Sequence, residues 1–309
     1  MLIPKCLKTT HSYNMFEKGD GVVVGLSGGA DSITLLLVLH SVKRYLGIEL
    51  SVCHFNHKTR KESDDEALYA KRFSEDLGYP CYIEEWKAPA VSNIQKEARV
   101  ARYRFFLKKA KDLEAKKIAL GHNLNDSAET TLFHITRGER PLPIPPKSVM
   151  DGITIVRPLI EIEAEEIRGY LKKKNIPFIL DPSNALPAYS RNKIRLEIMP
   201  ELSKLNPNIA GSLTRLGKIT DRDRDYFKVV AKKAADECKA GDNAFSIPKL
   251  LSYHPAIIAY IIKEEGVSFS QIEQILSLLT KPGRWKVDMG KGGWAKRKKD
   301  LLIFEKNLN

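Results

Sequence analysis

The sequence predicts an α/β protein: a doubly wound parallel sheet of the Rossmann-like kind, followed by a smaller α+β domain. Short apolar runs alternate with helical segments over the first half of the chain, which is typical of strand–helix–strand units. A glycine-rich turn at residues 27–32 joins the first apolar run to the first helical segment. Polar residues follow two later strand candidates, and ligands bind at such strand ends in open parallel sheets.

The elements of the first domain follow from these patterns in chain order. Apolar or β-branched runs predict strands at residues 22–24, 49–55, 81–84, 117–121 and 153–156. Helical segments are expected at residues 33–45, 63–77, 94–110, 127–136 and 163–174. Residues 138–150 contain four prolines and interrupt the alternation, so we expect a loop there.

The second half of the chain is expected to be mainly helical, with a few strands at its end. Helices are predicted at residues 191–202, 209–238, 247–251, 255–265 and 268–279, and strands near residues 284–288, 294–298 and 301–304. The helix at 209–238 is dense in alternating charge and is interpreted as a linker. We therefore predict a catalytic domain with a helical extension at residues 1–215 and a second domain at residues 216–309.

Composition limits the cellular setting and the kinds of site. The longest uncharged apolar run, residues 33–40, is too short to cross a bilayer, and the N-terminus has no signal-peptide pattern. We expect a cytoplasmic protein without membrane contact. The four cysteines form no C-x-x-C pair, which argues against structural zinc, an iron–sulfur cluster or a disulfide framework.

The chain is strongly basic. It has 51 Lys and Arg against 38 Asp and Glu, a formal net charge of +13. This excess predicts a polyanionic partner such as nucleic acid, although a lysine-rich solvated surface would have the same composition.

The turn Ser27-Gly28-Gly29-Ala30-Asp31-Ser32 suits a phosphate group. Its glycines let the backbone approach closely, and the N–H groups at the start of the next helix point at a bound anion. The carboxylate of Asp31 would repel phosphate, and a shared Mg²⁺ would remove the conflict. The alternative is a tight turn in which Asp31 caps the helix. The turn is no Walker A loop, because no Gly-Lys-Ser/Thr follows.

This turn resembles the pyrophosphate-binding loop of the N-type ATP pyrophosphatases, the PP-loop proteins, whose fold is that of the adenine nucleotide alpha hydrolases. Further motifs follow in the order typical of the tRNA(Ile)-lysidine synthetase family, and the whole set resembles that family over roughly residues 20–210. They are His54-Phe55-Asn56-His57-Lys58-Thr59-Arg60, Glu97-Ala98-Arg99 with Gly121-His122-Asn123-Leu124-Asn125-Asp126, and Asp181-Pro182-Ser183-Asn184 with Arg191-Asn192-Lys193-Ile194-Arg195.

The resemblance implies a ligase that joins free L-lysine to carbon 2 of the wobble cytidine in an isoleucine tRNA with a CAU anticodon. ATP and Mg²⁺ would activate the base as an adenylated intermediate, with release of pyrophosphate and then AMP. Asp31, Arg102 and Asp126 are the expected catalytic residues, with Asp31 also facing Mg²⁺. The expected ATP contacts are Ser27, Gly28, Gly29, Ala30, Asp31, Ser32, His54, Arg99 and Arg102.

The other expected roles each have a simpler alternative. Asp126 and Glu129 share one helix face and would hold the ammonium groups of lysine, although acidic residues also cap helices. Arg99 is equally well a solvated residue, and His54 equally well a buried core histidine. The expected tRNA contacts are Asn56, His57, Arg60, Arg191, Arg195, Lys296, Arg297 and Lys298. The last three belong to residues 281–299, which hold eight Lys or Arg and one acidic residue.

Two departures from the family pattern and two rival functions remain. Asn125 stands where the family often has an aspartate, and residues 139–143 replace a glycine- and leucine-rich loop. A PP-loop tRNA thiolase would use the same turn but needs a persulfide cysteine or a cluster. A non-catalytic RNA-binding protein would need no phosphate loop. The sequence leaves a homodimer open.

Overall fold

A computed structural model of the protein describes residues 2–58, 63–86, 94–180, 190–290 and 292–305. The chain forms two compact units, Met1–Lys218 and Ile219–Asn309, and the boundary between them falls inside the long helix α9 (Ile209–Cys238). Each unit is described by itself. Among the described residues, no helix combines the length and the apolar character that a membrane crossing requires.

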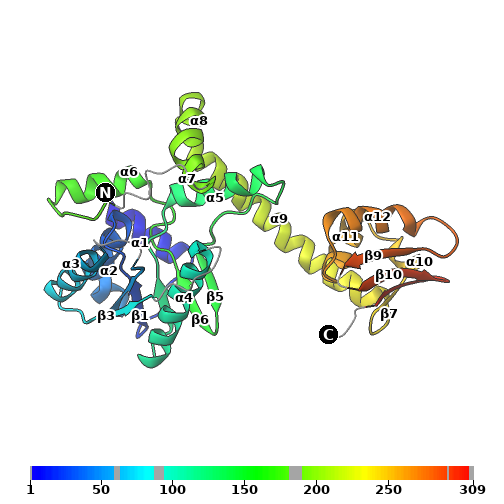
Figure 1. The fold of residues 1–309 in the computed structure, drawn as a ribbon, viewed down its shortest axis with the longest axis horizontal. Helices are drawn as coiled ribbons and strands as arrows, with labels where there is room; N and C mark the ends of the chain where they lie inside the picture. Colours follow the sequence, from blue (N-terminus) through cyan, green and yellow to red (C-terminus); the bar gives the residue numbers. More distant parts are fainter. Residues whose placement is uncertain (1, 59–62, 87–93, 181–189, 291, 306–309) are drawn as a thin grey trace. The chain divides into compact units, whose positions relative to one another are not determined.

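The first unit is built on a six-stranded sheet with the order β3-β2-β1-β4-β6-β5 (Figure 1). The parallel strands are β1 (Gly21–Gly25), β2 (Glu49–Asn56), β3 (Cys81–Glu85), β4 (Lys117–Ala119) and β6 (Ile153–Val156). The chain moves outward from β1 to β3 and then returns to place β4 on the other side of β1. This confirms the predicted doubly wound sheet and locates its switch point between β1 and β4, where such sheets bind ligands.

Helices cover both faces of this sheet because its strands alternate their side chains between two cores. Val22 and Val24 pack with α1 (Leu2–Ser12), α2 (Ala30–Leu46), α3 (Ser63–Asp76) and α6 (Ala164–Lys173). Val23 points to the opposite face and packs with α4 (Ile94–Asp112), whose Phe105 and Phe106 are buried. Both faces of the sheet are therefore covered by apolar packing, so a polar site can form only at the ends of the strands.

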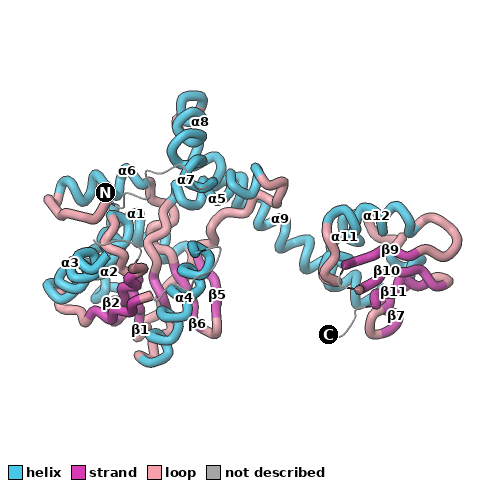
Figure 2. The backbone as a smooth tube through the Cα atoms, viewed as in Figure 1, coloured by secondary structure: helices cyan, strands magenta, loops and turns pink. Residues whose placement is uncertain are grey.

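The remaining helices of the first unit form a smaller cluster. Ala128 of α5 (Leu124–Thr136) packs against Ile194, Met199 and Leu213. A single helix was expected at residues 191–202, and the structure instead has α7 (Ser190–Lys193), a π-helical segment (Ile194–Ile198) and α8 (Met199–Leu205). Figure 2 shows the backbone of α5, α7 and α8. Pro200 has no N–H to donate to the preceding turn, which explains why the regular hydrogen-bond pattern is interrupted just before it.

Two elements of the first unit were not expected. Helix α1 buries Leu2, Cys6, Thr9 and Thr10 on one face. Residues 138–150 were expected to be a loop, but Lys147–Met150 form β5, which pairs antiparallel with β6. The connecting residues Asp151 and Gly152 both have positive φ, 49° and 81°, as a two-residue hairpin turn requires.

The second unit combines the end of α9 with a separate antiparallel sheet of order β7-β8-β11-β10-β9. Its elements are β7 (Lys239–Gly241), β8 (Ala244–Ser246), α10 (Ile247–Leu250), α11 (Pro255–Lys263), α12 (Phe269–Leu279), β9 (Lys286–Gly290), β10 (Gly293–Lys298) and β11 (Leu301–Glu305). The helices pack on one sheet face around Leu302 and Phe304. This confirms the predicted α+β character, although the short strands β7 and β8 were not expected.

Replacing Leu36 by Ala should destabilise the first unit, because this α2 side chain is fully buried at 0% exposure. We expect the free energy of unfolding to fall by about 2–5 kcal/mol. The matched control is Leu205→Ala, since Leu205 is 85% exposed, and it should change the value by less than about 0.5 kcal/mol. Chemical denaturation measures both stability changes. The signal is the fluorescence of Trp86, with Trp285 and Trp294 replaced by Phe in all variants. Equal losses would contradict this placement of α2.

Candidate active site

The glycine-rich turn lies between β1 and α2 and is held by its own two serines. The hydroxyls of Ser27 and Ser32 are 3.1 Å apart, and the Ser32 hydroxyl donates to the Gly29 carbonyl at 3.0 Å and accepts from the Ser27 N–H at 3.1 Å. Gly29 is the N-cap of α2, and no side-chain hydrogen bond caps this helix. The first N–H groups of α2 are therefore available to a bound anion.

Gly28 has a φ of +85°, which favours glycine, and a segment distant in sequence covers it. A Cβ at this position would lie 2.4 Å from Cδ1 of Ile179, and the Ile179 N–H donates to the Gly28 carbonyl at 2.9 Å. Sequence reasoning missed Ile179, because nothing in its own pattern links it to a turn so far away in the chain.

Asp31 does not cap α2, so the simpler interpretation of this residue is wrong. Its Oδ1 accepts a hydrogen bond from Nδ2 of Asn123 at 3.0 Å. Burial, assisted by the nearby charge of Asp126, raises the pKa of Asp31 to about 6. Gly121, just before Asn123, lets β4 approach, because a Cβ there would lie 3.0 Å from the Asp31 backbone. A half-buried carboxylate of this kind favours a cation beside it.

Asp126 and Glu129 lie on the same face at the start of α5, as the sequence predicted. Asn123 is the N-cap of α5 and forms a capping box with Asp126, whose Oδ2 accepts the Asn123 N–H at 3.0 Å while Oδ1 of Asn123 accepts the Asp126 N–H at 3.0 Å. The second carboxylate oxygen of Asp126 points away from the cap. Glu129 is only 3% exposed, and burial raises its pKa.

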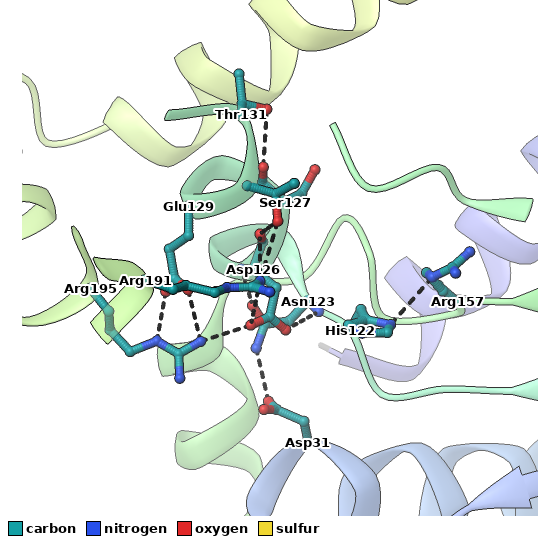
Figure 3. A network of polar contacts seen from close by, with 11 residues as sticks. Asp31, His122, Asn123, Asp126, Ser127, Glu129, Thr131, Arg157, Arg191 and Arg195 are labelled. Carbon is teal, nitrogen blue, oxygen red and sulfur yellow. Dashed lines mark hydrogen bonds and ion pairs between the residues drawn. The ribbon is translucent and has the colours of Figure 1, made fainter. Parts of the chain in front are cut away.

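Arg195 joins the two carboxylates (Figure 3). Its Nε and Nη2 donate to the two oxygens of Glu129 at 2.8 and 2.9 Å, and Nη2 also donates to Oδ1 of Asp126 at 2.8 Å. Arg191 lies on the same pair, with its Nε 3.7 Å from Glu129. The residues predicted to hold lysine and two residues predicted to hold tRNA thus form one network, which the sequence did not indicate.

The expected ATP residues on α4 lie in a basic region. The guanidinium groups of Arg99 and Arg102 lie 5.2 and 5.8 Å from the centre of the Tyr103 ring. Burial lowers the pKa of Arg102, and the charge of Arg99 lowers it further. Arg157, which sequence reasoning missed, is 5% exposed and lies near the same groups. A cluster of guanidinium groups of this kind suits phosphate oxygens.

The motif at the end of β2 is more buried than substrate contacts require. His54 is 4% exposed, and its Nδ1 donates to the Leu26 carbonyl at 2.9 Å, so it braces the entry to the glycine turn as a core histidine. Asn56 is 2% exposed, and its amide bonds Asp64 and the Lys58 N–H. These two side chains are committed inside the protein. The ring of His57 packs between Phe55 and Trp86. Arg60 and residues 181–184 lie outside the described residues.

Comparison with known proteins places this geometry in a family. The family model of the PP-loop domain matches residues 5–202. A tRNA(Ile)-lysidine synthase of Clostridioides difficile is 34% identical over 325 residues, covering 98% of this chain and 70% of that protein. The chain belongs to the tRNA(Ile)-lysidine synthase family. The family's enzyme from Caldanaerobacter subterraneus subsp. tengcongensis is 32% identical over 307 residues, covering 93% of this chain and 66% of that relative, so the chain spans about two thirds of its length.

A solved structure extends the likeness to the fold alone. A U34-tRNA thiolase from Methanococcus maripaludis, described with its [4Fe-4S] cluster, has a TM-score of 0.60 at 18% identity, over 71% of this chain and 78% of that one. In this member of the lysidine synthase family, Asn125 replaces the frequent aspartate, and its Oδ1 accepts the N–H of Ala164 at 2.9 Å. Asn125 thereby ties α5 to the start of α6.

The basic strand β10 presents its predicted tRNA residues on two faces. Arg297 lies on the core side with Ala295, and its guanidinium donates to the carbonyls of Leu279 and Lys281 at 3.2 and 2.5 Å. Nε donates as well, to the Lys299 carbonyl, so most of this guanidinium is engaged within the unit and Arg297 is a weaker candidate for a tRNA contact than its two neighbours. Lys296 and Lys298 alternate with it on the other face, and Lys296 pairs with Glu305.

Replacing Asp31 by Asn should stabilise the protein in a pH-dependent way. Folding raises the pKa of Asp31 to about 6, so ionisation of this carboxyl lowers the free energy of unfolding. The protein has its full stability below about pH 4 and loses part of it as pH rises through about 6. Asn keeps the bond to Asn123 without the charge. We expect a gain in the free energy of unfolding of up to about 3 kcal/mol near pH 7 and under about 1 kcal/mol near pH 4.

Chemical denaturation at the two pH values measures this difference. The control is Asp151→Asn, in the exposed hairpin turn after β5, which should alter stability little at either pH. An equal gain from Asp31→Asn at both pH values would show that titration of Asp31 is not the cause.

Proposed function

We propose that this protein is a tRNA(Ile)-lysidine synthetase, which ligates L-lysine to carbon 2 of the wobble cytidine of a CAU-anticodon isoleucine tRNA. ATP adenylates the cytidine oxygen with release of pyrophosphate, and the lysine amine then displaces AMP. The observation that carries the proposal is the acidic pair Asp126 and Glu129, joined to the glycine turn through Asn123 and Asp31. A phosphate cradle beside a cation-binding pair suits ATP and a diamino acid together.

ATP is assigned to the turn and the neighbouring basic region. The N–H groups at the start of α2 and the hydroxyls of Ser27 and Ser32 would hold the β- and γ-phosphates, and Arg102 would face the α-phosphate, with Arg99 beside it. Stabilisation of the departing pyrophosphate is the main contribution of these groups to the reaction.

Mg²⁺ fits the acidic side of the cradle. Among the described residues no group of three or more His, Cys, Asp or Glu forms a cage that could hold a metal ion, so any Mg²⁺ here must share the phosphates of ATP. The half-buried carboxylate of Asp31, whose pKa is raised to about 6, would hold it and gain charge compensation. The ion would neutralise phosphate charge. Ionised Asp31 is available for this above about pH 6.

Lysine is assigned to Asp126 and Glu129. Both carboxylates are held by Arg195 here, so a cation already occupies the position that an ammonium group would take. Lysine would exchange with part of this contact. The oxygens that Arg195 now fills would then bind the ammonium, and one of them could accept the proton that the attacking amine must lose. In this proposal Arg191 and Arg195, at 43% and 38% side-chain exposure, turn toward tRNA phosphates once lysine replaces them.

The tRNA would be held by phosphate contacts and its wobble base turned into the first unit. In the second unit, Lys296 and Lys298 share a face of β10 with Trp294, and the Lys286 ammonium lies 3.3 Å from the centre of the Trp294 ring. Lysines around a half-buried aromatic ring suit a nucleic-acid backbone and its bases. His57 near the end of β2 is retained as a candidate contact to the target base.

A thiolase is the nearest rival, and the cysteines speak against it. Burial raises the pKa of Cys6 and Cys53 to about 12, and Cys6, Cys53 and Cys238 are buried. A sulfur-transfer cysteine needs an accessible thiol of lowered pKa. A non-catalytic RNA-binding role would leave the cradle and its buried acidic network without a purpose, and such networks are costly to maintain.

The activity can be tested by following the incorporation of labelled lysine and of labelled sulfur into tRNA in parallel. Radiolabelled lysine should enter an isoleucine tRNA transcript with a CAU anticodon only when ATP is present. Glu129→Gln should lower kcat/KM for lysine by about 100-fold, because the ammonium loses a charged partner in a buried site. Lys109→Gln, a charge change on the far part of α4, is the control. ATP-dependent incorporation of sulfur instead of lysine would overturn the proposal.

Lys296→Ala combined with Lys298→Ala should weaken tRNA binding. Two lost phosphate contacts should reduce the slope of log affinity against log salt by about 1–2. The charge-matched control is Lys172→Ala with Lys173→Ala on exposed α6 positions of the first unit. Filter binding across a salt series measures both. Unchanged affinity and slope in the β10 variant would show that this face does not hold tRNA.

A further inference from the structure

His122 is a polar residue of the site to which no role has been given so far. It follows Gly121 just beyond the end of β4, directly before Asn123, whose side chain donates a hydrogen bond to Asp31. Its ring therefore lies at the switch point of the sheet, between the acidic network and Arg157 (Figure 3). The residue is partly exposed, so a ligand can reach it.

Arg157 determines where the His122 proton resides. Nε of Arg157 lies 3.3 Å from Nδ1 of His122. A guanidinium has only donors, so Nδ1 must be the acceptor and the single ring proton of a neutral imidazole must be on Nε2. Arg157 is itself fixed, because Nη1 donates to the Pro145 carbonyl at 2.8 Å and to the Ser148 hydroxyl at 3.2 Å.

The surroundings keep the imidazole neutral. Burial lowers the pKa of His122 to about 4, and the charges of Arg157, Arg102 and Arg99 lower it further against the opposing effect of Asp126. With Nδ1 occupied and its basicity suppressed, His122 is no candidate for the general base. What remains is one N–H donor, at Nε2, which makes no hydrogen bond to the described residues.

We propose that His122 contacts substrate directly and donates its Nε2–H to a non-bridging oxygen of the ATP α-phosphate. Arg157 is then a positioning residue, which enforces the tautomer from behind. An anionic acceptor is favoured because Arg99 and Arg102 face the same region and repel cations from it. This inference rests on the proposed use of ATP. It adds a neutral donor to the guanidinium of Arg102, at the phosphorus where the bond to pyrophosphate breaks.

The tautomer can be read by nitrogen-15 NMR of the histidine side chains. We expect the Nε2–H pattern for His122, assigned by its loss in His122→Gln. His54 is the internal control, because it donates through Nδ1 to a carbonyl and must show the opposite pattern. Arg157→Met removes the donor and should shift His122 toward a mixture of tautomers, and Arg157→Lys should restore the pattern in part. A His122 pattern unchanged in Arg157→Met would overturn the positioning role.

Titration with α,β-methylene-ATP tests the contact itself. The His122 Nε2 resonance should move on addition of this analogue, and addition of lysine alone should leave it in place. In turnover, His122→Gln keeps an amide N–H near the position of Nε2 and should lose less than about 10-fold in kcat, whereas His122→Asn places its amide near Nδ1 and should lose about 100-fold or more.

The two measurements separate this inference from the proposed function. If the analogue binds, as other resonances would report, and His122 does not respond, the contact is refuted while lysine ligation can still stand. If His122 responds but no lysine enters tRNA, the phosphate contact stands and the proposed function fails. Equal losses in the Gln and Asn variants would refute donation through Nε2.

Discussion

Three carboxylates that share one edge of the first sheet impose the constraint on which the site depends. Asp31, Asp126 and Glu129 are linked through Asn123 and Arg195, and burial raises the pKa of both Asp31 and Glu129. Such a group is tolerable only when cations accompany it. Arg195 supplies one within the protein, and its bidentate pairing with Glu129 satisfies both oxygens. The negative charge of this edge is therefore balanced without a ligand, and the ammonium group of a bound lysine could still take the place of Arg195.

The other half of the site has the opposite charge. Arg99, Arg102 and Arg157 lie close to Tyr103 and His122. Burial of His122 and the positive charges of these arginines lower its pKa to about 4. The glycine turn lies where the two halves meet, with Asn123 between Asp31 and Asp126. In the proposed reaction this division keeps phosphates on one side and an amine on the other, so that each charged substrate finds its complement without an added gate.

Much of this arrangement could be predicted from the sequence, because it depends on local patterns. The alternation of strands and helices, the glycine turn and the acidic face of α5 are all read within windows of about a dozen residues. Contacts between distant segments could not be predicted in the same way. Arg195 and Glu129 are 66 residues apart in the sequence. The contact between Ile179 and Gly28 likewise forms only when the chain is folded. The prolines just before β5 favoured a loop over a hairpin, although Asp151-Gly152 is a usable turn signal. His54 and Asn56 belong to a motif that predicted substrate contacts, and only the structure shows that both side chains are buried and bonded inside the protein.

In the proposed reaction this site breaks ATP between the α- and β-phosphates while a tRNA base takes up AMP. The most direct measurement is the identity and amount of the phosphorus products when the protein is supplied with ATP, Mg²⁺, lysine and the isoleucine tRNA transcript. We expect AMP and pyrophosphate, each equal to the lysine joined to tRNA, and neither without the tRNA. Formation of ADP and orthophosphate, or pyrophosphate release that does not depend on tRNA, would contradict the claim.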